Sequence, residues 1–247
     1  MLRRRWIPSP NFDERPNGSR IEFLIIHYTA CDFDLSLKIL TDGNSENRVS
    51  SHYLIDESGE VYHLVDEEKR AWHAGVSAWK KYQGINAFSL GIELVNPGHG
   101  PHCKAYSLPQ MNSLIELSKD LIQRYKIRKE FILGHADIAP YRKIDPGSFF
   151  DWKMMSDAGV GVYVSNVPRP QAVSRLNSED ILKNWTPQEK QLVSKYLSNW
   201  GYVFDKTQPE GLMPVLEAFL AHYCPEQIFQ PNAKDVLAVL QRLLRLQ

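Results

Sequence analysis

The sequence predicts an α/β domain followed by a small bundle of three helices. Residues 21–28 form a near-continuous apolar run of β-branched and aromatic residues, typical of a strand buried on both faces, and residues 89–95 form a second such run. An amphipathic helix that begins near residue 107 supplies the α component. Three more amphipathic helices with short loops occupy the last ~65 residues, which is enough for an independent module.

Length and charge narrow the classes of function. A chain of 247 residues can bury a substantial core, as one large domain or as one domain plus a small second one. Lysine plus arginine equals aspartate plus glutamate at 29 each, so the balance gives no reason to expect nucleic acid or an anionic membrane as partner. Three scattered cysteines are too few for a disulfide framework.

Export cannot be decided from the first residues. No segment approaches the ~20 apolar residues that a membrane-spanning helix needs. The first ten residues carry positive charge but lack the apolar region of a signal peptide. We therefore expect either a protein made without a signal or a chain that begins after processing.

Strands and a short helix are expected in the first third of the chain. The strand over residues 21–28 is followed by a short helix over residues 34–41, with Asp34 as its cap. Residues 51–56 and 60–65 are two strand-like runs separated by three residues that include a glycine. A connection of this kind predicts a β-hairpin.

The next elements are expected between residues 89 and 155. After the strand over residues 89–95, Ser107 and Gln110 form the two ends of a capping box that opens a helix. A short buried strand is predicted over residues 131–134 and a helix over residues 149–155. The apolar face of the long helix consists of Met111, Leu114, Ile115, Leu121, Ile122 and Tyr125.

The carboxyl-terminal part changes in character. Residues 159–178 mix Gly, Val, Pro, Ser and Asn and are predicted to be a linker. Thr186 to Glu189 form a capping box with proline at the first helical position, and Gly201 ends that helix. Two further helices are predicted over residues 210–222 and 233–246. The predicted division is a domain over residues 1–158, a linker over 159–178 and a helical domain over 179–247.

Residues 134–147 contain the strongest candidate site. They offer the imidazole of His135 and, ten positions later, the carboxylate of Asp145, with Lys143 two positions before it. A loop interrupted by Pro140 can fold back so that the first two groups face one point. Both groups suit zinc, and a catalytic zinc usually has three protein ligands and a water. On spacing alone, a loop with one packed histidine and a capping aspartate is the alternative.

His27 is the candidate for the third ligand. It lies at the carboxyl end of the strand over residues 21–28, and ligands gather at such ends in open α/β sheets. His135 likewise follows a short apolar strand. If the two strands are parallel neighbours, both imidazoles and Asp145 come within reach of one ion. Considered alone, His27 fits a hydrogen-bonded core histidine better than a metal ligand.

Two further features contain groups of chemical interest. Glu93 is the one charged residue of its apolar strand, and a lone buried carboxylate is costly unless it is paired or functional. His99, His102 and Cys103 lie in the following loop. Because they lack the fixed ligand spacing of zinc sites, this loop is interpreted as an exposed one.

Five motifs in order carry a resemblance to a known family. They are residues 25–30 (IIHYTA), 51–55 (SHYLI), 71–75 (AWHAG), 90–96 (LGIELVN) and 134–147 (GHADIAPYRKIDPG). Up to about residue 155, the chain resembles the zinc-dependent N-acetylmuramoyl-L-alanine amidases of the type-2 family, which includes bacterial amidases and peptidoglycan recognition proteins.

The resemblance implies a fold and a set of site residues. The implied fold is a mixed central β-sheet flanked by helices. The positions that match the family's ligands to one catalytic zinc are His27, His135 and Asp145. Glu93 matches the catalytic carboxylate and Lys143 the catalytic cation.

The tail resembles a peptidoglycan-binding module more loosely, through residues 197–202 and 217–225. This part of the likeness is to two-domain amidases that face the cell envelope. None of the module's ligand residues can be carried over onto this chain.

The implied activity is hydrolysis of the amide between N-acetylmuramic acid and L-alanine, in peptidoglycan or its fragments. Three residues are weaker candidates for substrate contacts. Trp72 is equally consistent with core packing, His52 with a group that orients a metal ligand, and His73 lies beside Trp72 in the same motif.

Two other functions stay open at this point, as does the compartment. One is a non-catalytic binder of cell-wall fragments, and the other a structural zinc closed by Cys31 as fourth ligand. The implied place is the bacterial cell envelope, periplasmic or facing the outer membrane, if a signal was removed. The alternative is muropeptide recycling in the cytoplasm.

Overall fold

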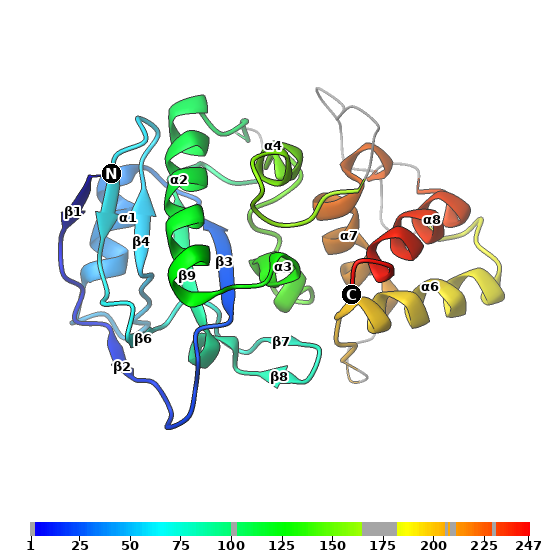
Figure 1. Ribbon diagram of the computed structural model, residues 1–247, viewed down its shortest axis with the longest axis horizontal. Coiled ribbons are helices and arrows are strands. Elements are labelled where there is room, and N and C mark those ends of the chain that lie inside the picture. The colour runs from blue at the N-terminus through cyan, green and yellow to red at the C-terminus, as the bar shows by residue number, and fades with distance from the viewer. Residues whose placement is uncertain (1–2, 100–102, 165–181, 206, 208–210, 229–230) are drawn as a thin grey trace.

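A six-stranded mixed sheet forms the centre of the amino-terminal part in the computed structural model (Figure 1). The structure describes residues 3–99, 103–164, 182–205, 207, 211–228 and 231–247. This sheet confirms the predicted α/β class with a mixed central sheet. In spatial order its strands are β1 (Arg4–Trp6), β5 (Val61–His63), β4 (Tyr53–Ile55), β9 (Ser89–Leu94), β3 (Phe23–Tyr28) and β10 (Ile132–Gly134).

Strand direction decides where polar groups meet. Strands β4, β9, β3 and β10 run parallel, so their carboxyl ends lie at one edge of the sheet. In the register of β3 with β9, His27 lies opposite Glu93, and Ile26 lies opposite Gly134 of β10. Because paired residues on neighbouring strands project to the same face, the His27 and Glu93 side chains share one side of the sheet. The buried runs predicted from the sequence are confirmed.

The remaining strands are short. β4 and β5 form the predicted antiparallel hairpin. Two small two-stranded sheets complete the set: β2 (Phe12–Glu14) pairs with β6 (Lys69–Ala71), and β7 (Ala78–Trp79) pairs with β8 (Tyr82–Gln83).

Helices α1 (Phe33–Thr41) and α2 (Leu108–Tyr125) differ from prediction only at their caps. The capping side chain of α1 belongs to Asp32, which accepts the Leu35 amide, and not to Asp34 as predicted. Ser107 caps α2 as predicted, but Gln110 does not reach back to it. Its Nε2 instead donates to two carbonyls at the ends of β4 and β9, which fastens α2 to the sheet. Figure 1 shows α2 lying across the sheet.

Two short helices follow β10. Helix α3 (His135–Ile138) begins directly after the strand, so it leaves from the edge where the parallel strands end. Helix α4 (Trp152–Asp157) begins later than predicted, because the Asp151 side chain caps it by accepting the amide of Met154.

The predicted helical bundle is present at the carboxyl-terminal end. It contains α6 (Pro187–Trp200), α7 (Leu212–Tyr223) and α8 (Ala233–Leu244). The Thr186–Glu189 capping box and the end of α6 at Gly201 are confirmed. Residues 165–178 of the expected linker lie outside the described residues. In the described part of the chain, no helix is long and apolar enough to cross a membrane.

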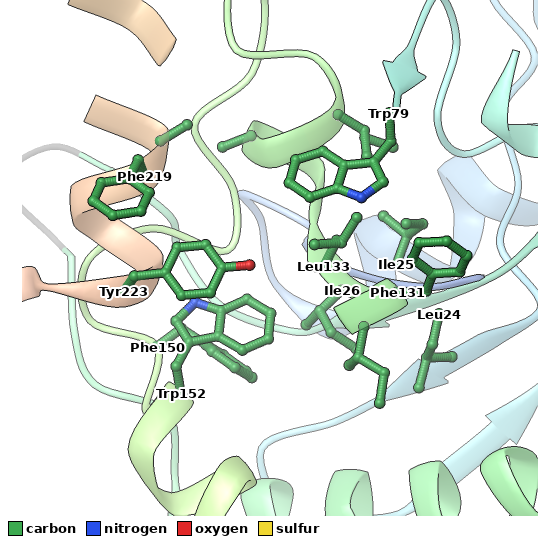
Figure 2. Packing of buried hydrophobic residues seen from close by; sticks show 14 of the residues in the cluster. Leu24, Ile25, Ile26, Trp79, Phe131, Leu133, Phe150, Trp152, Phe219 and Tyr223 are labelled. Atoms are coloured by element: carbon green, nitrogen blue, oxygen red, sulfur yellow. The ribbon is translucent and has the colours of Figure 1, made fainter. Parts of the chain in front are cut away.

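The helical bundle shares one hydrophobic core with the sheet domain. Figure 2 shows Phe219 and Tyr223 of α7 beside Phe150 and Trp152, close to the buried residues of β3 and β10. Trp79 is fully buried and packs edge-on against Tyr202, with ring centroids 4.9 Å apart. The division into domains that end at residue 158 and begin at residue 179 therefore stays a prediction. In the structure the two parts pack against each other through one continuous core.

Gly201 lies directly against the Trp79 ring, with no room for a side chain between them. This contact yields a prediction. A Cβ at this position would lie 2.4 Å from Cε2 of Trp79, so Gly201→Ala should lower the free energy of unfolding by about 1–3 kcal/mol through overpacking. Urea denaturation measures it. Gly18→Ala is the control, because Gly18 has a positive φ but no atom near its Cβ position. Equal losses in both variants would contradict the packing argument.

Candidate metal centre and active site

Three side-chain atoms converge at the edge where β3 and β10 end. His27 Nδ1 lies 3.0 Å from His135 Nδ1, and Asp145 Oδ2 lies 3.1 Å from each of them. All three residues are buried. Among the described residues they are the one group of at least three potential ligands close enough to share an ion. The structure thus brings together the three residues that the sequence predicted as metal ligands.

The loop that returns Asp145 to His135 is held by its backbone. The Ala136 amide donates to the Asp145 carbonyl at 2.8 Å, and the amides of Arg142 and Lys143 both donate to the Ala139 carbonyl. Gly134 leaves room for this return, because a Cβ there would lie 2.6 Å from Cδ of Pro146.

A chain of hydrogen bonds decides which nitrogen of His27 carries the proton. The Ser89 hydroxyl donates to the Ile85 carbonyl at 2.8 Å, so its oxygen accepts from Nε2–H of His73 at 3.0 Å. Nδ1 of His73 is then an acceptor, and Nε2–H of His27 donates to it at 2.9 Å. Neutral His27 therefore directs the lone pair of Nδ1 toward the cluster.

The other two ligand atoms are acceptors as well. Nε2–H of His135 donates to the Ala74 carbonyl at 3.1 Å, which leaves a lone pair on Nδ1 of the neutral ring. Asp145 contributes a carboxylate oxygen. Three acceptors within 3.1 Å repel one another unless a positive centre, a proton or a metal ion, lies among them.

The geometry fits a metal ion. Donor atoms around a tetrahedral ion bound at 2.0–2.1 Å are about 3.3 Å apart, close to the spacing observed here. A proton on His27 is disfavoured, because burial and the neighbouring His135 lower the pKa of His27 to about 4. Burial alone would raise the pKa of Asp145, but positive charge on a neighbouring imidazole, when His135 or His27 carries a proton, holds it far below its usual range.

Glu93 and Lys143 line the pocket that opens beside this cluster. The pocket has a volume of about 360 Å³, and its wall also includes Asp145, His73 and Trp72. Within the described part of the chain, Oε2 of Glu93 has no hydrogen-bond partner. Burial and the Asp145 carboxylate raise the pKa of Glu93 to about 8, while the Lys143 charge opposes this shift. An unpartnered carboxylate facing a pocket suits proton transfer.

The three candidate substrate contacts lie in different places. Trp72 lines the pocket, and Arg48 lies over its ring at 5.3 Å. His73 also lines the pocket, but both of its ring nitrogens are engaged with His27 and Ser89. His52 is fully buried behind His73 and is not part of the pocket wall; its Nδ1 accepts the Gly91 amide.

Cys31, the candidate fourth ligand, lies outside the group of three. It lines the same pocket, but its Sγ contacts Ser36 Oγ at 3.2 Å. Among the described residues, the cluster therefore has three protein ligands. Of the His99, His102 and Cys103 loop, His102 lies outside the described residues.

Two contributors were missed by sequence reasoning. Ser89 begins β9 and ends the proton chain from His27, and Arg142 donates to the Ala74 carbonyl at 3.0 Å, the same carbonyl that orients His135. Arg142 adjoins Lys143 in the 134–147 motif, which was an available sign. Ser89 gave no sign, because its role depends on a ring 16 positions earlier.

The fold and a candidate metal site beside a buried carboxylate are consistent with a metal-dependent hydrolase, and comparison with known proteins gives the family. Residues 17–148 match the family described as N-acetylmuramoyl-L-alanine amidase. The chain belongs to this family and is an enzyme of the amidase class.

Individual relatives agree with this assignment. AmiD of Escherichia coli is 38% identical over 91% of this chain and 83% of its own length. AmpD of Haemophilus influenzae is 39% identical over 60% of this chain and 88% of its own. The structure of AmiD with the substrate anhydro-N-acetylmuramic acid-L-Ala-D-γ-Glu-L-Lys superposes with a TM-score of 0.78 at 33% identity, covering 94% of this chain and 92% of that one. AmpDh3 of Pseudomonas aeruginosa with an anhydromuramic pentapeptide gives 0.75 at 33% identity, covering 92% of each chain.

The proton chain predicts an effect on metal affinity. Ser89→Ala removes the acceptor that fixes the His73 proton, so His27 can adopt the tautomer with a proton on Nδ1. We expect about ten-fold weaker metal binding, measured with zinc as the probe ion by competition with a chromophoric chelator. The matched control is Ser118→Ala, which removes a fully buried hydroxyl that has no partner in the described structure. Unchanged affinity in Ser89→Ala would contradict the tautomer argument.

The raised pKa of Glu93 predicts a pH-dependent cost in stability. Because the metal-free folded protein holds this proton more tightly than the unfolded chain, its stabilising effect is complete below a glutamate's ordinary pKa and is lost as pH rises through about 8. Glu93→Gln should therefore stabilise the metal-free protein more at pH 9 than at pH 5, measured by urea denaturation. An equal effect at both values would show that burial does not perturb this carboxyl.

Proposed function

We propose that this protein hydrolyses the amide between the lactyl group of N-acetylmuramic acid and L-alanine in peptidoglycan fragments, with one zinc held by His27, His135 and Asp145. The observation that carries the proposal is the convergence of three lone pairs beside the unpartnered carboxylate of Glu93. A set of three neutral or anionic ligands that is open to a pocket suits a catalytic zinc rather than a closed structural one.

The reaction divides among the chain's own residues. When bound, zinc supplies a Lewis acid and lowers the pKa of a water molecule to about 7. Glu93 then takes the water proton on its free oxygen and passes it to the leaving amine of L-alanine. Lys143, on the same pocket wall, steadies the negative charge that develops on the amide oxygen. Trp72 and His73 both line the pocket. Trp72 contacts the substrate, and His73 orients His27 through their hydrogen bond.

Soluble muropeptides are the proposed substrate class. Two relatives of known structure were determined with anhydromuramic peptides, and these complexes align over nearly the whole of this chain. The alternative of a wall-binding protein without activity is set aside, because the metal group, Glu93 and Lys143 are all in place.

We also propose that residues 1–158 are the catalytic domain and residues 179–247 a peptidoglycan-binding-like domain, joined by residues 159–178. For the compartment, the cell envelope is proposed, with cytoplasmic muropeptide recycling as the alternative.

The role of Glu93 gives the sharpest test. Glu93→Ala should keep zinc and lose about 10²–10⁴-fold in kcat on an anhydromuramoyl tripeptide, because proton transfer is lost while the three ligands stay. Mass spectrometry of the released peptide measures turnover, and bound zinc is measured in parallel. Glu68→Gln, on the exposed surface, is the control.

Removal of the metal is the companion experiment. A chelator should abolish peptide release from both muropeptides and purified cell wall, and added zinc should restore it. Near wild-type turnover by Glu93→Ala would overturn the assigned role, and zinc-loaded wild-type protein that releases no peptide would overturn the proposed function.

A further inference from the structure

The carboxylate of Asp137 is buried two positions after the ligand His135, in helix α3, and it takes no part in the proposed reaction. Its Oδ2 accepts the Gly134 amide and Nδ1–H of His222, both at 2.7 Å. Its Oδ1 accepts the Tyr202 hydroxyl at 2.5 Å. Only 2% of Asp137 is exposed, so these three donors replace the water that would otherwise solvate the charge.

Two of the three donors come from the carboxyl-terminal helices. Tyr202 follows α6 and His222 lies in α7, both outside the residues 17–148 that match the family. His222 is fixed in place by stacking on Trp152 at 3.6 Å and on Tyr223 at 3.7 Å, and the latter two rings lie close together in Figure 2. Burial and the Asp137 carboxylate raise the pKa of Tyr202 well above its usual value, so its hydroxyl stays a donor.

A second tie reaches the loop that carries Asp145. The Tyr141 hydroxyl donates at 3.0 Å to the Gly211 carbonyl, at the start of α7. The carboxyl-terminal helices therefore hold α3 at one point and the returning loop at another. These two segments supply two of the three ligand atoms, His135 Nδ1 and Asp145 Oδ2.

We propose that the carboxyl-terminal helices act as a clamp on the metal centre, with Tyr202 and His222 positioning α3 through Asp137 and Tyr141 fixing the loop. Metal sites need their ligands held within about 0.5 Å of the productive geometry. Without the two distal donors, Asp137 keeps a single hydrogen bond in a buried position, and α3 must move to let water reach the carboxylate. His135 is the first residue of α3 and moves with it. The proposal rests on the proposed function only in taking zinc as the bound metal.

The test is the zinc affinity of variants at the clamp. Tyr202→Phe removes one donor to Asp137 and keeps the ring, and we expect about ten-fold weaker zinc binding, with a larger loss in the double variant Tyr202→Phe/Tyr141→Phe. The readouts are chelator competition with zinc and the visible spectrum of the cobalt-substituted protein, which reports ligand geometry. Circular dichroism establishes that each variant is folded.

Matched variants separate a local effect from general destabilisation. Tyr53→Phe removes another buried tyrosine hydroxyl from a carboxylate, that of Glu67, but this pair lies away from the ligand-bearing segments, so zinc affinity should stay within two-fold of wild type. His222→Asn keeps a donor near the position of Nδ1 and should lose less than Tyr202→Phe. If Tyr202→Phe does not fold, the zinc affinity of His222→Ala, which removes the other distal donor, is compared with wild type instead.

Each outcome decides between the two proposals. Wild-type affinity and an unchanged cobalt spectrum in folded Tyr202→Phe or His222→Ala overturn the clamp, whatever the activity. Wild-type protein that binds zinc but releases no peptide overturns the proposed function and leaves the clamp standing if the variants bind more weakly. Wild-type protein that binds no zinc overturns both.

Discussion

Three lone pairs directed at one point are the constraint on which the rest of the structure depends. Two imidazole lone pairs and a carboxylate oxygen that lie within 3.1 Å of one another repel unless a proton or a metal ion lies among them. The parallel order of β9, β3 and β10 brings the strand ends together, and the returning loop adds the carboxylate. The outer nitrogens of both histidines are committed to His73 and to the Ala74 carbonyl, so the inner ones stay free of protons.

Two carboxylates at the same edge of the sheet, Asp145 and Glu93, have different roles because their surroundings differ. Positive charge shared with the two imidazoles keeps Asp145 ionised, whereas Oε2 of Glu93 has no hydrogen-bond partner in the described structure and burial raises the pKa of Glu93 to about 8. Different environments separate the pKa values of the two neighbouring acids. One site can therefore contain both a permanently ionised ligand and a group that transfers protons. The unpaired Glu93 is a local cost in stability, and the continuous apolar core behind β3 and β9 offsets it.

The sequence predicted those features that depend on neighbours along the chain or on strand ends. Buried runs located β3 and β9, and a histidine at the end of one strand and after another gave two ligands. Contacts between distant segments left no local pattern. His73 was a candidate substrate contact from its motif alone, yet it packs over Gly91, where a Cβ would lie 2.5 Å from its ring. Gln110 has the right spacing for a capping box, but two strand-end carbonyls compete for its amide and win.

Asp137 shows why the carboxyl-terminal helices matter to the chemistry as well as to the core. Its distal donors lie 65 and 85 positions away, so no spacing in the motif around it could reveal them. A relative such as AmpD of Haemophilus influenzae matches 60% of this chain across 88% of its own length, so the family fold does not require the whole of this chain. Here the segment that bears two ligands is held from outside the family domain. Binding linkage is reciprocal, so whatever affinity the helices add for the metal, the metal returns as stability of their docking. The bundle and the metal centre are then one cooperative unit, in which loosening either part weakens the other.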